Sequence, residues 1–357
     1  MTPTRKTPSR RRRSAGASNI TIRDVAAAAR VSVATISRVL SNPGQVAPAT
    51  RKAVLQVVRR MGYSPNAAAK SLRTFRSRKF LVTVPDIANP FFARIIQGIE
   101  DAALAEGYSV VLGDTHHEPG REEHYALMLM QREADGLIFL GHRLPESLKA
   151  WFRSRSSMPP VVNGCEYSRS LAVPSAHIDN AAAAAQAMDY LYALGHKRIA
   201  VVTGPMASPL SRDRLAGAQR SARAHRAQKQ LVVVNGDFSI DAGITAAARL
   251  LALEPRPTAV FCFNDEMAFG VLDHARRRGL KLPESLSVVG FDDIRFARYA
   301  DPPLTTISQP AQEIGRETVR LLIGVLNGTI KSAVSVTLPH RLEIRSSCAP
   351  RSDAGPA

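Results

Sequence analysis

The chain has 357 residues, of which 45% are hydrophobic and 6% aromatic, and this length predicts two or three domains rather than one core. No run of 18 apolar residues occurs, and three distant cysteines, Cys165, Cys262 and Cys348, give neither a disulfide framework nor a zinc spacing. The sequence therefore argues against a membrane span and for a cytoplasmic protein. The net charge of +18 points to an anionic partner.

The positive charge is concentrated at the N-terminus. Residues 1–80 contain 18 Lys and Arg and one acidic residue, Asp24, whereas the other 277 residues are close to neutral. This asymmetry predicts binding to nucleic acid or to an anionic membrane surface, and a solvated basic tail is the alternative. Residues 1–18 are rich in Pro, Ser and Arg, which predicts a disordered basic arm. No apolar segment follows their arginines, so an export signal is not indicated.

Residues 19–62 have the spacing of three short helices. Thr21 and Asp24 match a capping box for the first helix, and Ser32 can cap a second helix over residues 33–40. Small residues at the crossing let these two helices approach closely, which predicts a helix-turn-helix unit with its second helix in a major groove.

The third helix of this unit is expected to start at Pro48 and to end before Gly62. Residues 31–52 contain three basic residues and no acidic residue, as expected for a surface that approaches phosphates. A three-helix bundle that binds nothing would explain the apolar spacing but not the charge.

A short, basic and Ala-rich helix is expected over residues 66–73, after Pro65. It has too few apolar residues to be stable alone, and Leu72 would be exposed unless another molecule covered it. We predict a hinge helix in a minor groove, with Leu72 wedged between base steps. A plain basic linker is the alternative. Together with the three helices, this segment completes a DNA-binding domain over residues 19–75.

From Lys79 onward, short apolar segments alternate with amphipathic helical segments in two consecutive sets, with a break near Ile178. This alternation predicts an α/β fold with two parallel sheets, each covered on both faces. Residues 301–326 should cross back to the first set as a strand and then a helix, and residues 338–347 should form a closing strand pair. The expected core covers residues 78–348, with a first subdomain of 78–177 plus about 308–336, a second of 178–305 plus about 337–348, and then a tail of 349–357.

Polar and aromatic residues mark the carboxyl ends of these expected strands. Ligands of open parallel sheets bind at those ends, so two facing edges predict a cleft for a small polar ring compound. For Asp179 and Asp265, capping of the following helix is an equal alternative. The strand-end residues are Asp86, Asn89, Phe91, Phe92, Asp114, Asn163, Glu166, Asp179, Phe238, Asn264, Asp265, Asp292 and Asp293.

The segment TIRDVAAAARVSVATISRVLSNPGQVAPATRKAVLQVVRRMGYSPNAAAKSL resembles the DNA-binding head of the lactose/purine repressor family. The remaining chain to about Ser347 resembles the core of that family, which is similar to periplasmic sugar-binding proteins. The resemblance implies a transcriptional repressor that binds a double-stranded, pseudo-palindromic DNA operator as a homodimer and responds to a small effector.

The resemblance also assigns DNA contacts. Val33 and Ala34 fall at two base-reading positions, and their small side chains favour contact with thymine methyl groups. Leu72 matches the intercalating leucine of the family. Ala47 departs from the usual Ser that caps the third helix, and Pro48 is expected to compensate. The implied DNA-binding residues are Thr21, Ile22, Arg23, Ser32, Val33, Ala34, Thr35, Ser37, Arg38, Asn42, Asn66, Ala69 and Leu72.

In the core, the resemblance implies that Arg214 and Asp292 hold ligand hydroxyls such as those of a ribose. Phe238 matches an aromatic residue that stacks on the ligand, and Phe91 and Phe92 match a pair beside its ring. Segments such as DPPLTTISQP resemble members that respond to nucleosides such as cytidine, so the implied effector is a nucleoside, with a sugar or a purine as alternatives. The same members imply the cyclic-AMP receptor protein as a further partner.

Enzymatic functions find little support in the sequence. It contains no G-x-S-x-G, P-loop or G-x-G-x-x-G motif, and the run His116-His117-Glu118 lacks the spacing of a helical zinc site. We therefore predict no catalytic residue, no metal and no cofactor. A solute-binding protein with the same cleft is a competing function, against which the basic head argues. A nucleoside-processing enzyme is another, and turnover of cytidine or adenosine would reveal it.

Deletion of residues 1–17 should weaken binding to operator and to random DNA by the same factor. It should also flatten the dependence of affinity on salt, because a disordered basic arm contacts phosphates and reads no bases. Fluorescence anisotropy titrations with both DNAs at several salt concentrations measure the two effects. An unchanged salt slope would show that the arm does not touch DNA.

Overall fold

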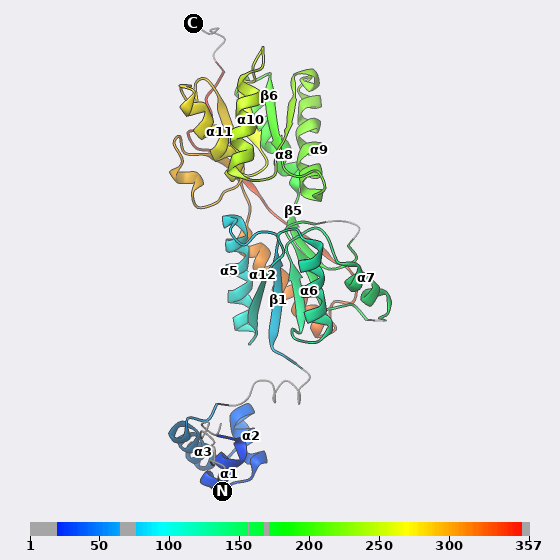
Figure 1. Cartoon of the computed structure of the whole chain (residues 1–357), viewed down its shortest axis with the longest axis vertical. Coiled ribbons are helices and arrows are strands. Elements are labelled where there is room, and N and C mark those ends of the chain that lie inside the picture. The colour runs from blue at the N-terminus through cyan, green and yellow to red at the C-terminus, as the bar shows by residue number, and fades with distance from the viewer. Residues whose placement is uncertain (1–19, 65–75, 156, 168–170, 352–357) are drawn as a thin grey trace, which may run out of the picture. The chain divides into compact units, whose positions relative to one another are not determined.

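The computed structural model describes residues 20–64, 76–155, 157–167 and 171–351. The chain divides into two compact units, residues 1–75 and 76–357, which we call the head and the core (Figure 1). The predicted arm and the predicted hinge helix, with Asn66, Ala69 and Leu72, lie outside the described residues. Among the described helices, none is long and apolar enough to cross a membrane.

The head contains the three helices expected from the sequence. The capping residues predicted for these helices are found at their ends. Thr21 N donates to the carboxylate of Asp24 at 2.8 Å, which closes the capping box of the first helix. Ser32 Oγ accepts the N–H of Thr35 at 3.1 Å and caps the second, and Gly62 ends the third with a φ of 63°. The elements are α1 (Ile22–Ala29), α2 (Val33–Ser41), a 3₁₀ turn (Pro43–Gln45) and α3 (Pro48–Met61).

The hydrophobic core of the head is small. Its buried members come from all three helices and are Val25, Ala26, Ile36, Val39 and Val54. At the start of α3, Ala47 provides no side-chain cap, and Pro48 occupies the first turn, where a missing backbone N–H costs nothing. The helices therefore pack through one narrow apolar stripe each, and the outer side of α2 remains available to other molecules.

The core contains two six-stranded sheets. All of their strand pairs are parallel except β10 with β12, which is antiparallel. The first sheet has the order β11 (Ser335–Leu338), β5 (Ser175–Ile178), β4 (Val161–Gly164), β3 (Gly136–Phe139), β1 (Lys79–Val84) and β2 (Ser109–Asp114). The second has the order β12 (Arg341–Glu343), β10 (Thr305–Ser308), β9 (Ser287–Asp292), β8 (Ala259–Cys262), β6 (Ile199–Thr203) and β7 (Val232–Asn235).

Helices flank each sheet and form two lobes (Figure 1). The central strands are buried along their whole length, as their continuous apolar runs predict. The first lobe holds α5 (Pro90–Ala105), α6 (Pro119–Met130), α7 (Glu146–Arg153) and α12 (Ala311–Leu326). The second holds α8 (Asn180–Ala193), α9 (Pro209–Ala224), α10 (Ile240–Leu251) and α11 (Asp265–Arg277), with 3₁₀ turns at Gln228–Gln230 and Ala297–Tyr299.

The chain crosses between the two sheets three times. It passes from β5 to α8, from β10 to α12, and from β11 to β12. The expected strand-then-helix crossing at residues 301–326 is therefore present. The predicted closing strand pair is wrong, because β11 pairs with β5 in the first sheet and β12 pairs with β10 in the second. Pro339 and His340 make the third crossing instead.

Gly98→Ala should destabilise the core. Helices α5 and α12 cross so closely that a Cβ at Gly98 would lie 2.1 Å from the carbonyl oxygen of Gln312, and overpacking of this kind costs about 1–3 kcal/mol. Gly120→Ala is the matched control, since a Cβ there would meet nothing within 4 Å. Urea unfolding followed by circular dichroism measures both, and equal midpoints for the two variants would contradict the close packing.

Candidate functional site

A cavity of about 600 Å³ lies between the two sheets, at the carboxyl ends of their strands. Its walls are the segments that follow β1, β2 and β4 in the first sheet and β6, β7 and β8 in the second, together with Asp292 at the end of β9. The size suits a small organic ligand. Eight of the ten effector-site residues expected from the sequence line it: Asp86, Asn89, Phe91, Phe92, Arg214, Phe238, Asn264 and Asp292.

The first-sheet side of the cavity is partly aromatic. Phe91 and Phe92 occupy the first turn of α5, with ring centroids 5.7 Å apart and planes inclined by 55°. Asn89 fixes this turn, because its Oδ1 accepts the N–H of Phe91 at 2.9 Å. Asp86 makes an equivalent local contact with the N–H of Ala88 at 2.8 Å. The two polar residues therefore shape the wall that presents the rings.

Phe238 faces the cavity from the second sheet with a left-handed backbone, at a φ of 76°. This conformation is uncommon for a bulky residue and is held by its neighbours. Asn264 Nδ2 donates to the carbonyl of Phe238 at 2.7 Å. Gly204 leaves room for the ring, since a Cβ there would lie 2.0 Å from the Phe238 ring. Asn264 is therefore a positioning residue for this aromatic side chain.

Arg214 and Asp292 form the polar centre of the cavity, and both are buried. Arg214 Nη2 lies 4.0 Å from Asp292 Oδ1, which is an ion pair but not a direct hydrogen bond. Arg214 Nε donates to Asn180 Oδ1 at 2.8 Å, Nη1 donates to the carbonyl of Phe263, and the guanidinium stacks 3.6 Å over the ring of Phe291. The two charged groups therefore keep hydrogen-bonding capacity for a ligand.

Burial raises the pKa of the Asp292 carboxyl to about 7, although the Arg214 guanidinium and a hydrogen bond from Gln309 oppose the rise. Gln309 Nε2 donates to Asp292 Oδ1 at 2.7 Å. Burial also lowers the pKa of Arg214, against the attraction of Asp292. The backbone of Asp292 is strained, with a φ of 111°. A carboxyl with these properties is typical of a functional site.

Two expected site residues, Asp179 and Asp265, do not line the cavity. Asp179 is exposed and caps α8, where its Oδ1 accepts the N–H of Ala182 at 2.9 Å. Asp265 is fully buried and accepts hydrogen bonds from Thr306 Oγ1 at 2.5 Å and from Ile294 N at 2.8 Å. Helix capping therefore accounts for Asp179, and Asp265 holds the segments next to Asp292 in place.

Several lining residues were not assigned to the site from the sequence. They include His116 and His117 after β2, Glu166 after β4 and Glu266 on α11. The strand-end pattern contains Glu166, but the family resemblance does not single it out. In the sequence, the two histidines were considered only as part of a possible metal site. In the structure, His116 Nε2 lies 2.9 Å from Asp114 Oδ2.

The head presents a basic and largely exposed surface around α2. Val33, at its N-terminus, is 40% exposed, and Ala34 and Arg38 are also exposed. The hydroxyl of Ser32 is already engaged in the helix cap. Of the other expected DNA contacts, Thr21, Arg23 and Asn42 are exposed, and Ile22, Thr35 and Ser37 are half-buried.

Asp24 is the single acidic residue between residues 20 and 64. Hydrogen bonds from the backbone N–H and the side chain of Thr21 lower the pKa of its carboxyl, so its negative charge is tied to the start of α1. The N-terminal end of α2 thus carries the small side chains of Val33 and Ala34, and α2 contains Arg38 and no carboxylate, which suits an approach to DNA.

Known proteins share both units. Residues 21–66 match the family described as bacterial regulatory proteins, lacI family, and residues 188–348 match the periplasmic binding protein-like domain. The chain is 43% identical over 328 residues to the HTH-type transcriptional repressor CytR of Escherichia coli (strain K12), which covers 92% of this chain and 96% of that protein.

Solved structures agree with these matches. A lac repressor dimer bound to operator and the anti-inducer ONPF has a TM-score of 0.83 at 27% identity, over 92% of this chain and 99% of that chain. A LacI family transcriptional regulator from Enterococcus faecium with bound ribose has a TM-score of 0.69 at 29% identity, over 77% and 100%. With its helix-turn-helix head and two-lobed core, the chain belongs to the lacI family of bacterial regulatory proteins and is a DNA-binding transcriptional repressor.

Proposed function

We propose that this repressor binds its operator as a homodimer and that a nucleoside in the core cavity alters its affinity for DNA. The observation that carries the proposal is the placement of Arg214 and Asp292, 4.0 Å apart, in a cavity that Phe238 also lines. A guanidinium donates and a carboxylate accepts hydrogen bonds, so together they can hold vicinal hydroxyls. An aromatic ring beside them can cover the face of a base.

Sugars and purines are the alternative effectors. The Enterococcus faecium relative was solved with bound ribose, which supports a hydroxyl-bearing ligand for this type of core. A free sugar would leave the three phenylalanines of the cavity without an aromatic partner, and a free purine would leave Arg214 and Asp292 without hydroxyls. A nucleoside uses both parts of the site. The 43% identity to CytR over most of the chain agrees with a close functional relationship.

The homodimer is supported by the lac repressor relative, which was solved as a dimer on its operator. The core also exposes an aromatic surface that a second copy can cover. Tyr299 is 79% exposed and Phe296 is 44% exposed, and both line a shallow groove with Leu272 of α11. Large exposed aromatic side chains that gather at one place are typical of a protein interface.

Arg214→Ala and Asp292→Ala should each abolish nucleoside binding while operator binding without ligand persists. Removal of one group leaves its partner buried and without its counter-charge, which costs about 1–3 kcal/mol or more. Arg223→Ala, an exposed change on the same helix, is the control and should bind nucleoside normally. Calorimetry with cytidine measures binding, and circular dichroism checks the fold. Normal affinity in either variant would remove that residue from the site.

Nucleoside affinity should rise between pH 6 and pH 8 and then level off. The pKa of Asp292 is raised to about 7, so the carboxyl is largely protonated at pH 6 and attracts Arg214 and ligand hydroxyls less strongly. Glu266 also lines the cavity, and burial and the nearby Asp86 raise its pKa. Calorimetry at pH 6, 7 and 8 measures it. Asp292→Asn should lose most of the dependence, and a flat profile in the unaltered protein would contradict the role of Asp292.

A further inference from the structure

Glu166 is a buried acid with an unused hydrogen-bond acceptor at the cavity. It follows β4, lines the cavity and is 4% exposed. Its Oε2 lies 2.7 Å from Nδ1 of His142, and since a carboxylate accepts, this nitrogen carries the hydrogen. Among the described residues, no group donates to Oε1 of Glu166. Oε1 is not enclosed by protein atoms, so a ligand in the cavity that Glu166 lines can donate a hydrogen bond to it.

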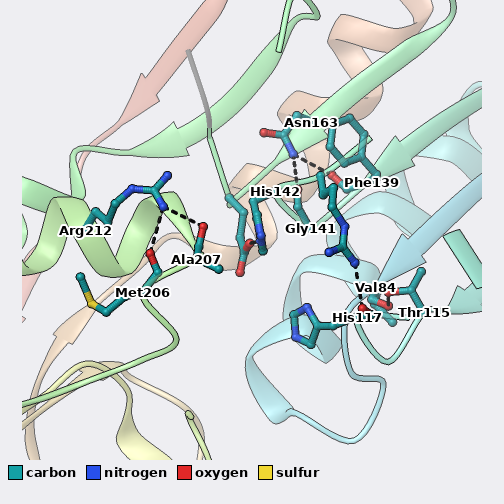
Figure 2. Close-up of polar contacts among 12 residues, drawn as sticks. Val84, Thr115, His117, Phe139, Gly141, His142, Asn163, Met206, Ala207 and Arg212 are labelled. Atoms are coloured by element: carbon teal, nitrogen blue, oxygen red, sulfur yellow. Dashed lines mark hydrogen bonds and ion pairs between the residues drawn. The ribbon is translucent and has the colours of Figure 1, made fainter. Parts of the chain in front are cut away.

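The turn that carries His142 is fixed by hydrogen bonds from both sides (Figure 2). Asn163 Nδ2 donates to the carbonyls of Phe139 at 3.1 Å and Gly141 at 2.9 Å. Arg143 Nη2 donates to the carbonyl of His117 at 2.8 Å. The backbone of this turn is therefore fixed, and the 2.7 Å contact with His142 orients Glu166, as discrimination between similar ligands requires.

The cavity is also negatively charged. Of its described lining residues, Arg214 is the single Lys or Arg, alongside His116 and His117, whereas six are acidic: Asp86, Glu166, Asp237, Asp241, Glu266 and Asp292. A phosphate group would be repelled by this excess of carboxylates, and repulsion is strong where water is partly excluded. The charge balance therefore favours an uncharged ligand over its phosphorylated form.

We propose that Glu166, oriented by His142, selects the base of the effector by accepting a hydrogen bond from an exocyclic amino group. The effector is then an unphosphorylated nucleoside whose base carries an amino group, as cytosine and adenine do. This inference rests on the proposed nucleoside site. Cytosine N4 and adenine N6 are donors, whereas uracil presents a carbonyl oxygen in the same place, as hypoxanthine does. Two acceptors that face each other repel, so uridine and inosine bind less tightly.

The test compares cytidine, uridine, adenosine, inosine and cytidine 5′-monophosphate by calorimetry on the full-length protein. The unaltered protein should prefer an amino-bearing nucleoside over its carbonyl counterpart by about tenfold or more, as expected for one matched base contact. The two pairs of nucleosides show whether the base is cytosine or adenine. The monophosphate should bind more weakly than the nucleoside, also by about tenfold or more.

Glu166→Gln should bring the ratio of amino to carbonyl affinities close to one, because a glutamine amide can turn to accept or to donate. Glu118→Gln is the matched control, since Glu118 is exposed and pairs with Arg121 outside the cavity. It should leave every affinity unchanged. His142→Ala should lower the same ratio to a smaller extent, because Glu166 keeps its charge but loses its orientation.

Three results would overturn the assignment of Glu166. If Glu166→Gln weakens cytidine and uridine equally, the carboxylate holds a hydroxyl that both share. If the ratio does not change, Glu166 does not touch the base. If the monophosphate binds as tightly as the nucleoside, the charge argument is wrong. None of these three results contradicts the nucleoside site itself. If the unaltered protein binds no nucleoside, both the proposed function and this inference are wrong.

Discussion

The opposed charges of Arg214 and Asp292 are the interaction on which the core depends. Each is buried, and each would be costly without the other. The surrounding structure holds them close without allowing direct contact: Phe291 lies under the guanidinium, Gln309 contacts the carboxylate, and Asp265 fixes the adjoining segments. A site of this kind is stable when empty and still has hydrogen bonds to offer, which is what a reversible ligand sensor requires.

The two units use charge in opposite senses. The head carries most of the excess positive charge of the chain and a single acidic residue, so it attracts a polyanion from a distance. The described lining of the core cavity has six acidic residues and one Arg, a balance that repels anions. One chain can therefore bind DNA and a small ligand without competition between the two, because neither surface attracts the ligand of the other.

The sequence predicts those features that depend on local pattern. Strand and helix alternation shows in the core because central strands are buried on both faces, and the caps at Thr21, Ser32 and Gly62 are set by neighbours within a few residues. Asp179 was ambiguous because a carboxylate at a strand end can cap a helix or bind a ligand. The separate sheets of β11 and β12 depend on packing between distant segments, which leaves no local signature. Glu166 belonged to the strand-end pattern, but nothing in the sequence distinguished it from the other polar residues at strand ends.

The three crossings of the chain between the sheets have a consequence for folding. In the first sheet β5 pairs with β11, and Ser175 lies opposite Ser335, a partner that follows every helix and every strand of the second lobe except β12 in the chain. During synthesis, the first lobe therefore has to wait for α12 and β11 while its strand edge stays open. Such long-range pairing slows folding and exposes an edge to aggregation. The chain returns from the second lobe through β10 and then α12, and this edge is closed only when β11 pairs with β5.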